Sequence, residues 1–511
     1  MKKLKKLMAV LTAAVTVISM SLPAMADGVK PTKSDKQTAT VSNVEAGATV
    51  TAYQIVKADY NDNGFIGYSA VEGVTLADVT APTSKEITDI AQEINPGKFT
   101  GAVTMTTTAT SGLADFTADL SAGSWVVIVS GNVEEVYNPM LLSVYYSISG
   151  SDNTMNQKPL DANSNWTLVT KDAYAKSTEP KVEKTIVGSG SGNSKGDDVA
   201  IGDTVNFQID TTIPSYSDQY KEVVVKISDK LSKGLELDQN SITIDGLTDA
   251  DNKDQYTIER HSDGFVITVN SDYALAHGNH PVKVTYSAKL TDEAGINFDA
   301  NSNTATLDYS NDPTDSDKVK TKEDKTYHYT FGIDANLGGG SDKVTEELIK
   351  GETKKTTASE TEFSPLRGAT FTLTNNNTSK VYEAISDEIG HLSFPGLDAG
   401  EYTLVETKAP DGYTLNDQEI PVVITAVYNG DGTLASYSIS IAGETTSTYE
   451  ADYTGETTVI TGESNPFPIE NTKLNELPST GGMGTYLFTI AGVAIISVAA
   501  IMLFVSKKKR V

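Results

Sequence analysis

The stretch GEYTLVETK, Gly400–Lys408, alternates apolar and polar side chains along its length. A period of two is the pattern of a half-buried β-strand, in which residues two apart lie on the same face. Tyr402, Leu404 and Glu406 therefore share the face that would turn toward a hydrophobic core. Burying an unpaired charge is costly, so we expect Glu406 to be neutral or to be consumed by a reaction in that core.

Five other strand-like segments combine an apolar row with one polar side chain on the same face. The polar residues fall into two sets, one in the middle of the chain and one near its end. Each set contains a lysine, a carboxylic acid and an asparagine, all directed inward by the period of two. The sets are Lys184, Asp229 and Asn311, and Lys350, Glu406 and Asn471.

Two members of these sets have alternatives. Asn301 and Asn303 share the parity of Asn311 in the same stretch, so the period of two does not separate them. Lys343 is an alternative to Lys350. We choose Lys350 because the segment that it ends, residues 347–350, precedes Leu366-Arg367-Gly368-Ala369.

Burial gives such a set a definite chemistry. It lowers the pKa of a lysine and raises that of a carboxyl group, so both become neutral. A neutral amine can attack the side-chain carbonyl of asparagine, while the protonated acid polarises that carbonyl and moves protons. Ammonia leaves and an amide bond joins two strands, without any cofactor, because the fold supplies proximity. We therefore predict bonds from Lys184 to Asn311 and from Lys350 to Asn471, with Asp229 and Glu406 as catalysts.

The composition favours an all-β protein of about three domains. The chain has 511 residues, is rich in Thr, Val, Ser and Gly, and contains only 7% aromatic residues. That composition is typical of β-sandwiches. Cysteine is absent, so the usual staple of extracellular domains is not available. The net charge of −28 excludes nucleic acid and anionic lipid as natural partners.

Both ends of the chain indicate export. Residues 1–26 combine four early lysines, an apolar run and the small-residue site Ala24-Met25-Ala26, which predicts a signal peptide cleaved between Ala26 and Asp27. Residues 486–505 are twenty uncharged residues, enough to cross a bilayer core of about 30 Å as a helix. Residues 506–511 form a basic tail that should stay in the cytoplasm.

A pentapeptide before this span resembles the LPxTG sorting signal recognised by sortases. The residues are Leu477, Pro478, Ser479, Thr480 and Gly481. The resemblance implies that a sortase cuts between Thr480 and Gly481 and joins the new carboxyl group to an amine. Followed by an apolar span and a basic tail, the motif is specific. It implies a membrane-bound precursor that becomes anchored to the peptidoglycan of a Gram-positive cell wall.

Between these ends we expect three units, at residues 27–175, 176–318 and 326–474. The second resembles the fimbrial isopeptide-forming domain of pilins, and the third resembles the Cna B-type module. The matching segments are 182–185, 201–205, 227–231 and 309–313 in the second unit, and 366–373 and 400–413 in the third. The whole chain thus resembles the backbone subunit of a sortase-assembled pilus. The resemblance implies tandem immunoglobulin-like, Cna-type β-sandwiches and a structural role.

The same resemblance implies an acceptor lysine for polymerisation. Shaft pilins carry it in a Tyr-Pro-Lys-Asn motif after a tryptophan, and here Trp166 is followed by Tyr174-Ala175-Lys176-Ser177. Tyr and Lys match, whereas Ala175 and Ser177 depart from the motif. We take Lys176 as the acceptor, with Lys171 and Lys181 as alternatives. The implied partners are sortase, further subunits, peptidoglycan and a ligand on a host or neighbouring cell. A monomeric wall-anchored adhesin or minor pilin is the alternative function.

Other chemistry has little support in the sequence. Asp59–Gly64 resembles half of an EF-hand loop, but Ala70 stands where the loop needs a glutamate, so we interpret it as a turn. Only five histidines occur, and His277 and His280 have no third ligand nearby, so we predict no metal site. Neither a Ser-His-Asp signature nor a pair of catalytic carboxylates is evident, and we predict no turnover enzyme and no cofactor.

Overall fold

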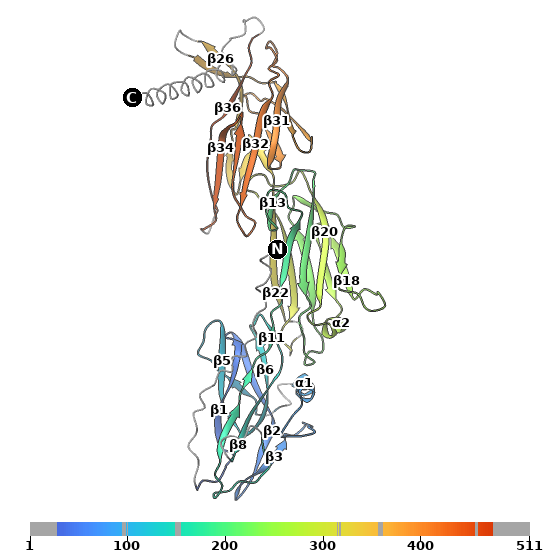
Figure 1. Cartoon of the computed structure of the whole chain (residues 1–511), viewed down its shortest axis with the longest axis vertical. Helices are drawn as coiled ribbons and strands as arrows, with labels where there is room; N and C mark the ends of the chain where they lie inside the picture. The colour runs from blue at the N-terminus through green and yellow to red at the C-terminus, as the bar shows by residue number, and fades with distance from the viewer. Residues whose placement is uncertain are drawn as a thin grey trace, which may run out of the picture.

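The computed structural model describes residues 28–94, 99, 101–148, 155–313, 315, 318–355, 361–454 and 458–473. These residues form three β-rich units stacked end to end in a long rod (Figure 1). The predicted all-β fold is confirmed. The signal peptide, the sorting motif, the apolar span 486–505 and the basic tail lie outside the described residues. Within the described ranges, no helix is long and apolar enough to span a membrane.

The first unit packs two sheets around a core that extends from Ala39 to Ala175. The sheet orders are β10-β1-β5 and β3-β2-β6-β8-β9. The predicted turn in Asp59–Gly64 is the β2–β3 hairpin. The elements are β1 (Lys36–Glu45), β2 (Ala48–Asn61), β3 (Gly64–Ala70), α1 (Ser84–Glu93), β4 (Val103–Met105), β5 (Leu113–Ser121), β6 (Gly123–Gly131), β7 (Val136–Tyr137), β8 (Met140–Ser147), β9 (Thr167–Lys171), β10 (Ala173–Tyr174) and β11 (Ser177–Thr178).

The second unit is a sandwich of the sheets β12-β14-β20-β16 and β13-β22-β21-β15-β19-β18. Its last strand, β22, pairs with β21 along ten residues and carries this sheet past residue 326, where the sequence places the start of the third unit. The elements are β12 (Val182–Val187), β13 (Gly196–Asp198), β14 (Thr204–Thr212), β15 (Val225–Leu231), β16 (Leu235–Leu237), β17 (Thr243–Asp245), β18 (Tyr256–His261), β19 (Gly264–Val269), α2 (Ser271–Ala276), β20 (Pro281–Leu290), β21 (Asn301–Ser310) and β22 (Val319–Tyr329).

The third unit is built on the seven-stranded sheet β29-β28-β31-β32-β33-β34-β35, with the sheet β27-β26-β36 and two short hairpins beside it. The alternating stretch Gly400–Lys408 is strand β31, as its sequence predicts. The elements are β23 (Phe331–Ile333), β24 (Asn336–Gly338), β25 (Ser341–Val344), β26 (Leu348–Lys355), β27 (Thr361–Pro365), β28 (Thr370–Asn375), β29 (Val381–Ile385), β30 (Phe394–Leu397), β31 (Gly400–Lys408), β32 (Ile420–Tyr428), β33 (Leu434–Ile441), β34 (Glu444–Asp452), β35 (Val459–Ser464) and β36 (Phe467–Glu470).

Each junction between units is packed. Val136 of the first unit lies in the core of the second, and Phe298 of the second lies in the core of the third. At the second junction, Asp198 accepts hydrogen bonds from the backbone N–H of Ala399 (2.6 Å) and the hydroxyl of Tyr428 (2.7 Å). Because each unit contributes a side chain to the next core, the rod is a continuous packed body.

Two carboxyl groups are buried together where the third unit begins. Asp334 lies between β23 and β24 and accepts the backbone N–H groups of Glu347, Leu348 and Leu392 at 2.6, 3.0 and 2.8 Å. Glu347 in turn accepts the N–H of Asp334 and the hydroxyl of Tyr449 at 2.7 and 2.6 Å. Desolvation outweighs these bonds and raises the pKa of Asp334 from 3.8 to about 7. Burial also raises the pKa of Glu347.

This pair predicts an unusual dependence of stability on pH. Between pH 4 and 7 the folded state holds a proton on Asp334 that the unfolded chain has lost, so stability should fall as pH rises through this range and then level off. The full shift corresponds to at most about 4 kcal/mol. We expect the melting temperature of the third unit, followed by calorimetry, to decrease from pH 4 to 7. Asp334→Asn should flatten the profile, and equal slopes in both proteins would contradict the assignment.

Two buried lysine, acid and asparagine clusters

The first cluster crosses the sandwich of the second unit. Lys184 lies on β12 in one sheet, whereas Asp229 on β15 and Asn303 on β21 lie in the other. The Nζ atom of Lys184 is 2.5 Å from Oδ2 of Asp229, and both side chains are fully buried. Asn303 is also fully buried.

Strand register explains why these residues meet. Asp229 is opposite Ala305 and Leu231 is opposite Asn303 in the β15–β21 ladder. Asn303 is therefore diagonal to Asp229 and on the same inward face. Lys184 continues the inward row of β12 that includes Ile186. The period of two thus turns all three side chains into one core.

A tyrosine completes this cluster. The hydroxyl of Tyr286, on β20, accepts a hydrogen bond from Lys184 Nζ and another from Asn303 Nδ2, the latter at 3.0 Å. Its ring stacks on Phe207 with 5.3 Å between centroids, and the lysine amine lies 4.8 Å from the centroid of Phe207. Sequence reasoning missed Tyr286, although it follows Val282 and Val284 in a period-two row that could have identified it as inward-facing.

Burial drives the charged groups of this cluster toward their neutral forms. Desolvation lowers the pKa of Lys184, with the attraction of Asp229 opposing the shift. Desolvation raises the pKa of Asp229, with Lys184 opposing it. The pKa of Tyr286 is raised for the same reason, so its hydroxyl keeps its proton. A proton passed from the lysine to the acid would leave an amine and a carboxylic acid side by side.

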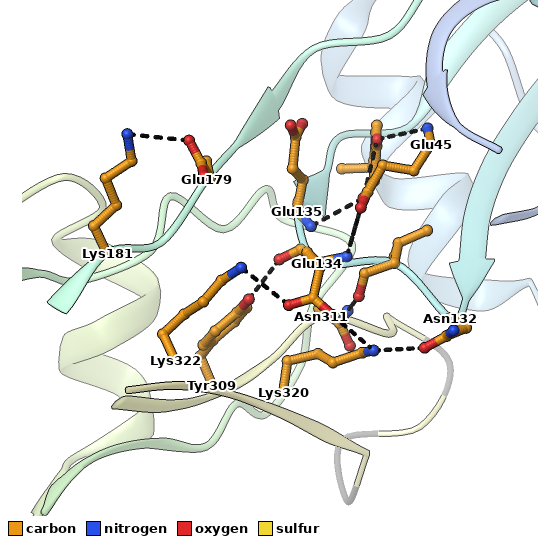
Figure 2. Close-up of polar contacts among 12 residues, drawn as sticks. Glu45, Asn132, Glu134, Glu135, Glu179, Lys181, Tyr309, Asn311, Lys320 and Lys322 are labelled. Carbon is orange, nitrogen blue, oxygen red and sulfur yellow. Dashed lines mark hydrogen bonds and ion pairs between the residues drawn. The ribbon is translucent and has the colours of Figure 1, made fainter. Parts of the chain in front are cut away.

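The structure does not bring Asn311 into this cluster, contrary to the prediction. That residue follows the end of β21, and its Nδ2 donates to the backbone carbonyl of Val133 in the first unit (Figure 2). Eight residues of extended chain, roughly 26 Å, separate it from Asn303. Asn301 is also excluded, since its side chain bonds the backbone of Gly295 and the carbonyl of His328. Parity identified the correct face of the strand, but it does not specify position along the strand.

Asn311 instead belongs to the junction of the first two units. Around it, Glu134 of the first unit pairs with Lys320 and Lys322 of β22 at 3.2 and 3.0 Å (Figure 2). Hydrogen bonding from Lys322 is the main cause that lowers the pKa of Glu134. The amide of Asn311 therefore helps hold two units together.

The second cluster, in the third unit, has the predicted members. Lys350 on β26, Glu406 on β31 and Asn471 just after β36 are all buried. Glu406 contacts both partners, with Oε1 3.1 Å from Lys350 Nζ and Oε2 2.8 Å from Asn471 Nδ2. In the parallel β26–β36 ladder Lys350 is opposite Ile469, which places Asn471 two residues further on. The alternative Lys343 is exposed on β25.

The surroundings of Lys350 are also apolar. Its amine lies 5.5 Å from the centroid of Phe371, and desolvation lowers its pKa despite the nearby Glu406. Lys350 Nζ and Asn471 Oδ1 have no well-aligned hydrogen bond partner among the described residues. An amine, a carboxyl group and a carboxamide in a dry core have the composition and proximity that amide exchange requires.

The predicted acceptor lysine lies in the connection between the first two units. Lys176 is exposed between β10 and β11, and its backbone carbonyl accepts the N–H of Asn138 at 3.1 Å. No described residue bonds its amine. The alternative Lys171 is exposed at the end of β9, whereas Lys181 pairs with Glu179 at 3.1 Å (Figure 2). The sorting residues 477–481 and the signal cleavage site, Ala26 and Asp27, lie outside the described residues.

Comparison with known proteins defines the class of the chain. Residues 34–177 match the model of the T6 antigen Ig-like domain, residues 351–435 match the prealbumin-like fold domain, and residues 469–511 match the LPXTG cell wall anchor motif. These matches confirm an LPXTG-anchored surface protein made of immunoglobulin-like and prealbumin-like β-domains.

Two relatives give a more particular likeness. The trypsin-resistant surface T6 protein of Streptococcus pyogenes serotype M6 is 28% identical over 533 aligned positions, which cover 94% of this chain and 96% of that protein. The solved structure of the T6 backbone pilin of that serotype superposes with a TM-score of 0.62 at 23% identity, over 87% of this chain and all of that one. The predicted resemblance to a sortase-assembled pilus backbone subunit is confirmed. The matched proteins are structural, in agreement with the prediction that the chain is not a turnover enzyme.

Proposed function

We propose that the chain is the repeating subunit of a covalent surface pilus, and that isopeptide bonds from Lys184 to Asn303 and from Lys350 to Asn471 lock its second and third units. The observation that carries the proposal is the occurrence, twice, of a fully buried lysine beside a buried acid and a buried asparagine. An ion pair in an apolar core gives little net stability, so its repeated use needs another explanation. Conversion of the lysine amine into an amide supplies that explanation, because it removes the positive group and leaves the acid free to stay protonated.

The reaction balances without a cofactor. The neutral lysine nitrogen attacks Cγ of the asparagine, the new Nζ–Cγ bond forms, the Cγ–Nδ2 bond breaks, and ammonia leaves with a proton that came from the lysine. Glu406 contacts both nitrogens and is placed to carry that proton, whereas Asp229 contacts the lysine nitrogen and would polarise the carbonyl. Each cluster reacts once, and its product is a neutral amide inside the core.

The proposed bonds would contribute to stability and strength. Each closes a loop of about 120 residues, which by the chain-entropy model of disulfides corresponds to roughly 4–5 kcal/mol. Unlike a disulfide, an amide cannot be reduced. In a protein without cysteine, this chemistry would supply the missing crosslink of an extracellular domain.

Polymerisation would use a separate lysine. A sortase cleaves between Thr480 and Gly481 and transfers the Thr480 carboxyl group to Lys176 of the next subunit. The exposure of Lys176, together with the absence of a bonded partner among the described residues, makes its amine accessible. The last subunit would be transferred to peptidoglycan, and the exposed surface would meet a ligand on a host or neighbouring cell. A monomeric adhesin or minor pilin is the alternative, and polymer formation separates the two.

The internal bonds predict the mass of the protein. The ectodomain, residues 27–480, should be lighter than its sequence mass by two ammonia molecules. Asn303→Ala and Asn471→Ala should each leave a deficit of one, measured by intact mass spectrometry. Asn311→Ala is the matched control, because it removes an equally buried asparagine from the same unit and should keep both bonds. A deficit of two in Asn303→Ala, or of one in Asn311→Ala, would reverse the assignment.

Polymer growth predicts the behaviour of Lys176→Arg. Arginine keeps the charge, but its guanidinium stays protonated and cannot act as the acceptor. We expect the variant to fold, to reach the wall as a monomer and to lose the ladder of high-mass species in blots of wall extracts. Lys171→Arg is the control and should keep the ladder. If the ladder persists in Lys176→Arg, the acceptor is another lysine. If the unmodified protein forms no ladder in the presence of an active pilus sortase, the adhesin function is favoured.

A further inference from the structure

The two clusters differ in how the acid reaches the reacting nitrogens. In the third unit one carboxylate spans both, since Glu406 contacts Lys350 Nζ through Oε1 and Asn471 Nδ2 through Oε2. In the second unit the acid is an aspartate, one methylene shorter. Oδ2 of Asp229 contacts Lys184, whereas Oδ1 has no hydrogen bond partner among the described residues. Asn303 donates instead to the hydroxyl of Tyr286 at 3.0 Å.

The hydroxyl of Tyr286 therefore occupies the position that the second carboxylate oxygen has in the third unit. It accepts hydrogen bonds from Lys184 Nζ, the attacking nitrogen, and from Asn303 Nδ2, the leaving nitrogen. The ring is held between Phe207, on which it stacks, and Phe265, which meets it edge to face at 5.1 Å between centroids. This packing fixes the oxygen between the two nitrogens that exchange places on Cγ.

We propose that Tyr286 is a catalytic residue of the second unit, which relays a proton from Lys184 Nζ to Asn303 Nδ2 while the crosslink forms. The inference rests on the proposed isopeptide bond. As Nζ bonds to Cγ and the Cγ–Nδ2 bond breaks, the phenol gives its proton to the departing nitrogen and takes one from the lysine nitrogen. The phenol is regenerated, and the net change is one secondary amide and one ammonia.

The environment favours this role. Burial keeps the phenol protonated, so the same oxygen can donate one proton and accept another. Asp229 remains available to polarise the carbonyl, because its Oδ1 atom has no hydrogen bond partner among the described residues. In this arrangement an aspartate and a tyrosine together do what a single glutamate does in the third unit.

The test is Tyr286→Phe in the ectodomain, residues 27–480, made by cell-free synthesis and sampled by intact mass spectrometry after translation stops. Phenylalanine keeps the ring and removes only the hydroxyl. We expect the third-unit bond to form as in the unmodified protein, while the second-unit bond forms about 10²-fold more slowly or not at all, the usual loss when a proton-transfer group is removed. Tyr309→Phe is the matched control, because that buried hydroxyl bonds Glu134 rather than the cluster.

The outcomes separate the two proposals. If the unmodified protein never forms the second-unit bond, the proposed crosslink itself is wrong. If it forms the bond and Tyr286→Phe forms it at the same rate, only the relay is overturned. A structural role is tested in the Asn303→Ala background, where neither protein can crosslink. If Tyr286→Phe lowers the melting temperature of the Asn303→Ala protein enough to unfold the second unit, the hydroxyl has a structural role and the relay is overturned. An unchanged melting temperature supports the relay.

Discussion

A lysine amine held out of water is the constraint on which the second and third units depend. Lys184 and Lys350 are both fully buried, and the amine of each lies near an aromatic ring and contacts one acid. Two charges moved from water into such a core lose more hydration energy than a typical pair regains. Desolvation lowers the pKa of both lysines and raises that of Asp229, which favours the neutral amine, and in the proposed reaction that amine becomes part of an amide. The same desolvation that would destabilise a static ion pair thus prepares the nucleophile.

The positions of the two clusters relate to how force would pass through a fibre. Lys184 lies on the first strand of the second unit and Asn303 on β21, the last strand but one. In the third unit Lys350 lies on β26, after the short strands β23 to β25, and Asn471 follows the last strand, β36. A bond between such ends carries tension across the unit, and the strands between them need not be pulled apart. This placement matters more for an extended rod than the few kcal/mol that loop closure adds, because force acts only along the covalent path.

The sequence predicted which residues face the core better than it predicted their positions along the strands. Alternation correctly turned Lys184, Asp229, Lys350, Glu406 and Asn471 inward, because side-chain direction depends only on the period of two. It did not separate Asn303 from Asn311, because position along the strand depends on the register of β21 with β15, which is a tertiary property. Tyr286 was not predicted because, apart from its hydroxyl, it belongs to an ordinary inward-facing apolar row of β20. Strand β22 was also missed, because most of its length alternates among charged and polar residues without an apolar face.

The first unit differs from the others in a way that the proposed fibre explains. Its buried polar residues in the described part of the chain are Ser124, Ser143, Ser147 and Thr167, with no lysine or acid among them. In the proposed fibre, tension would enter at Lys176, cross from Lys184 to Asn303, continue through β22 to Lys350, cross to Asn471 and leave at Thr480. Residues before Lys176 would lie outside this covalent path and would carry none of the force. A unit outside the tensile path has no need of a crosslink, and hydrophobic packing with the junction around Glu134 is sufficient to hold it.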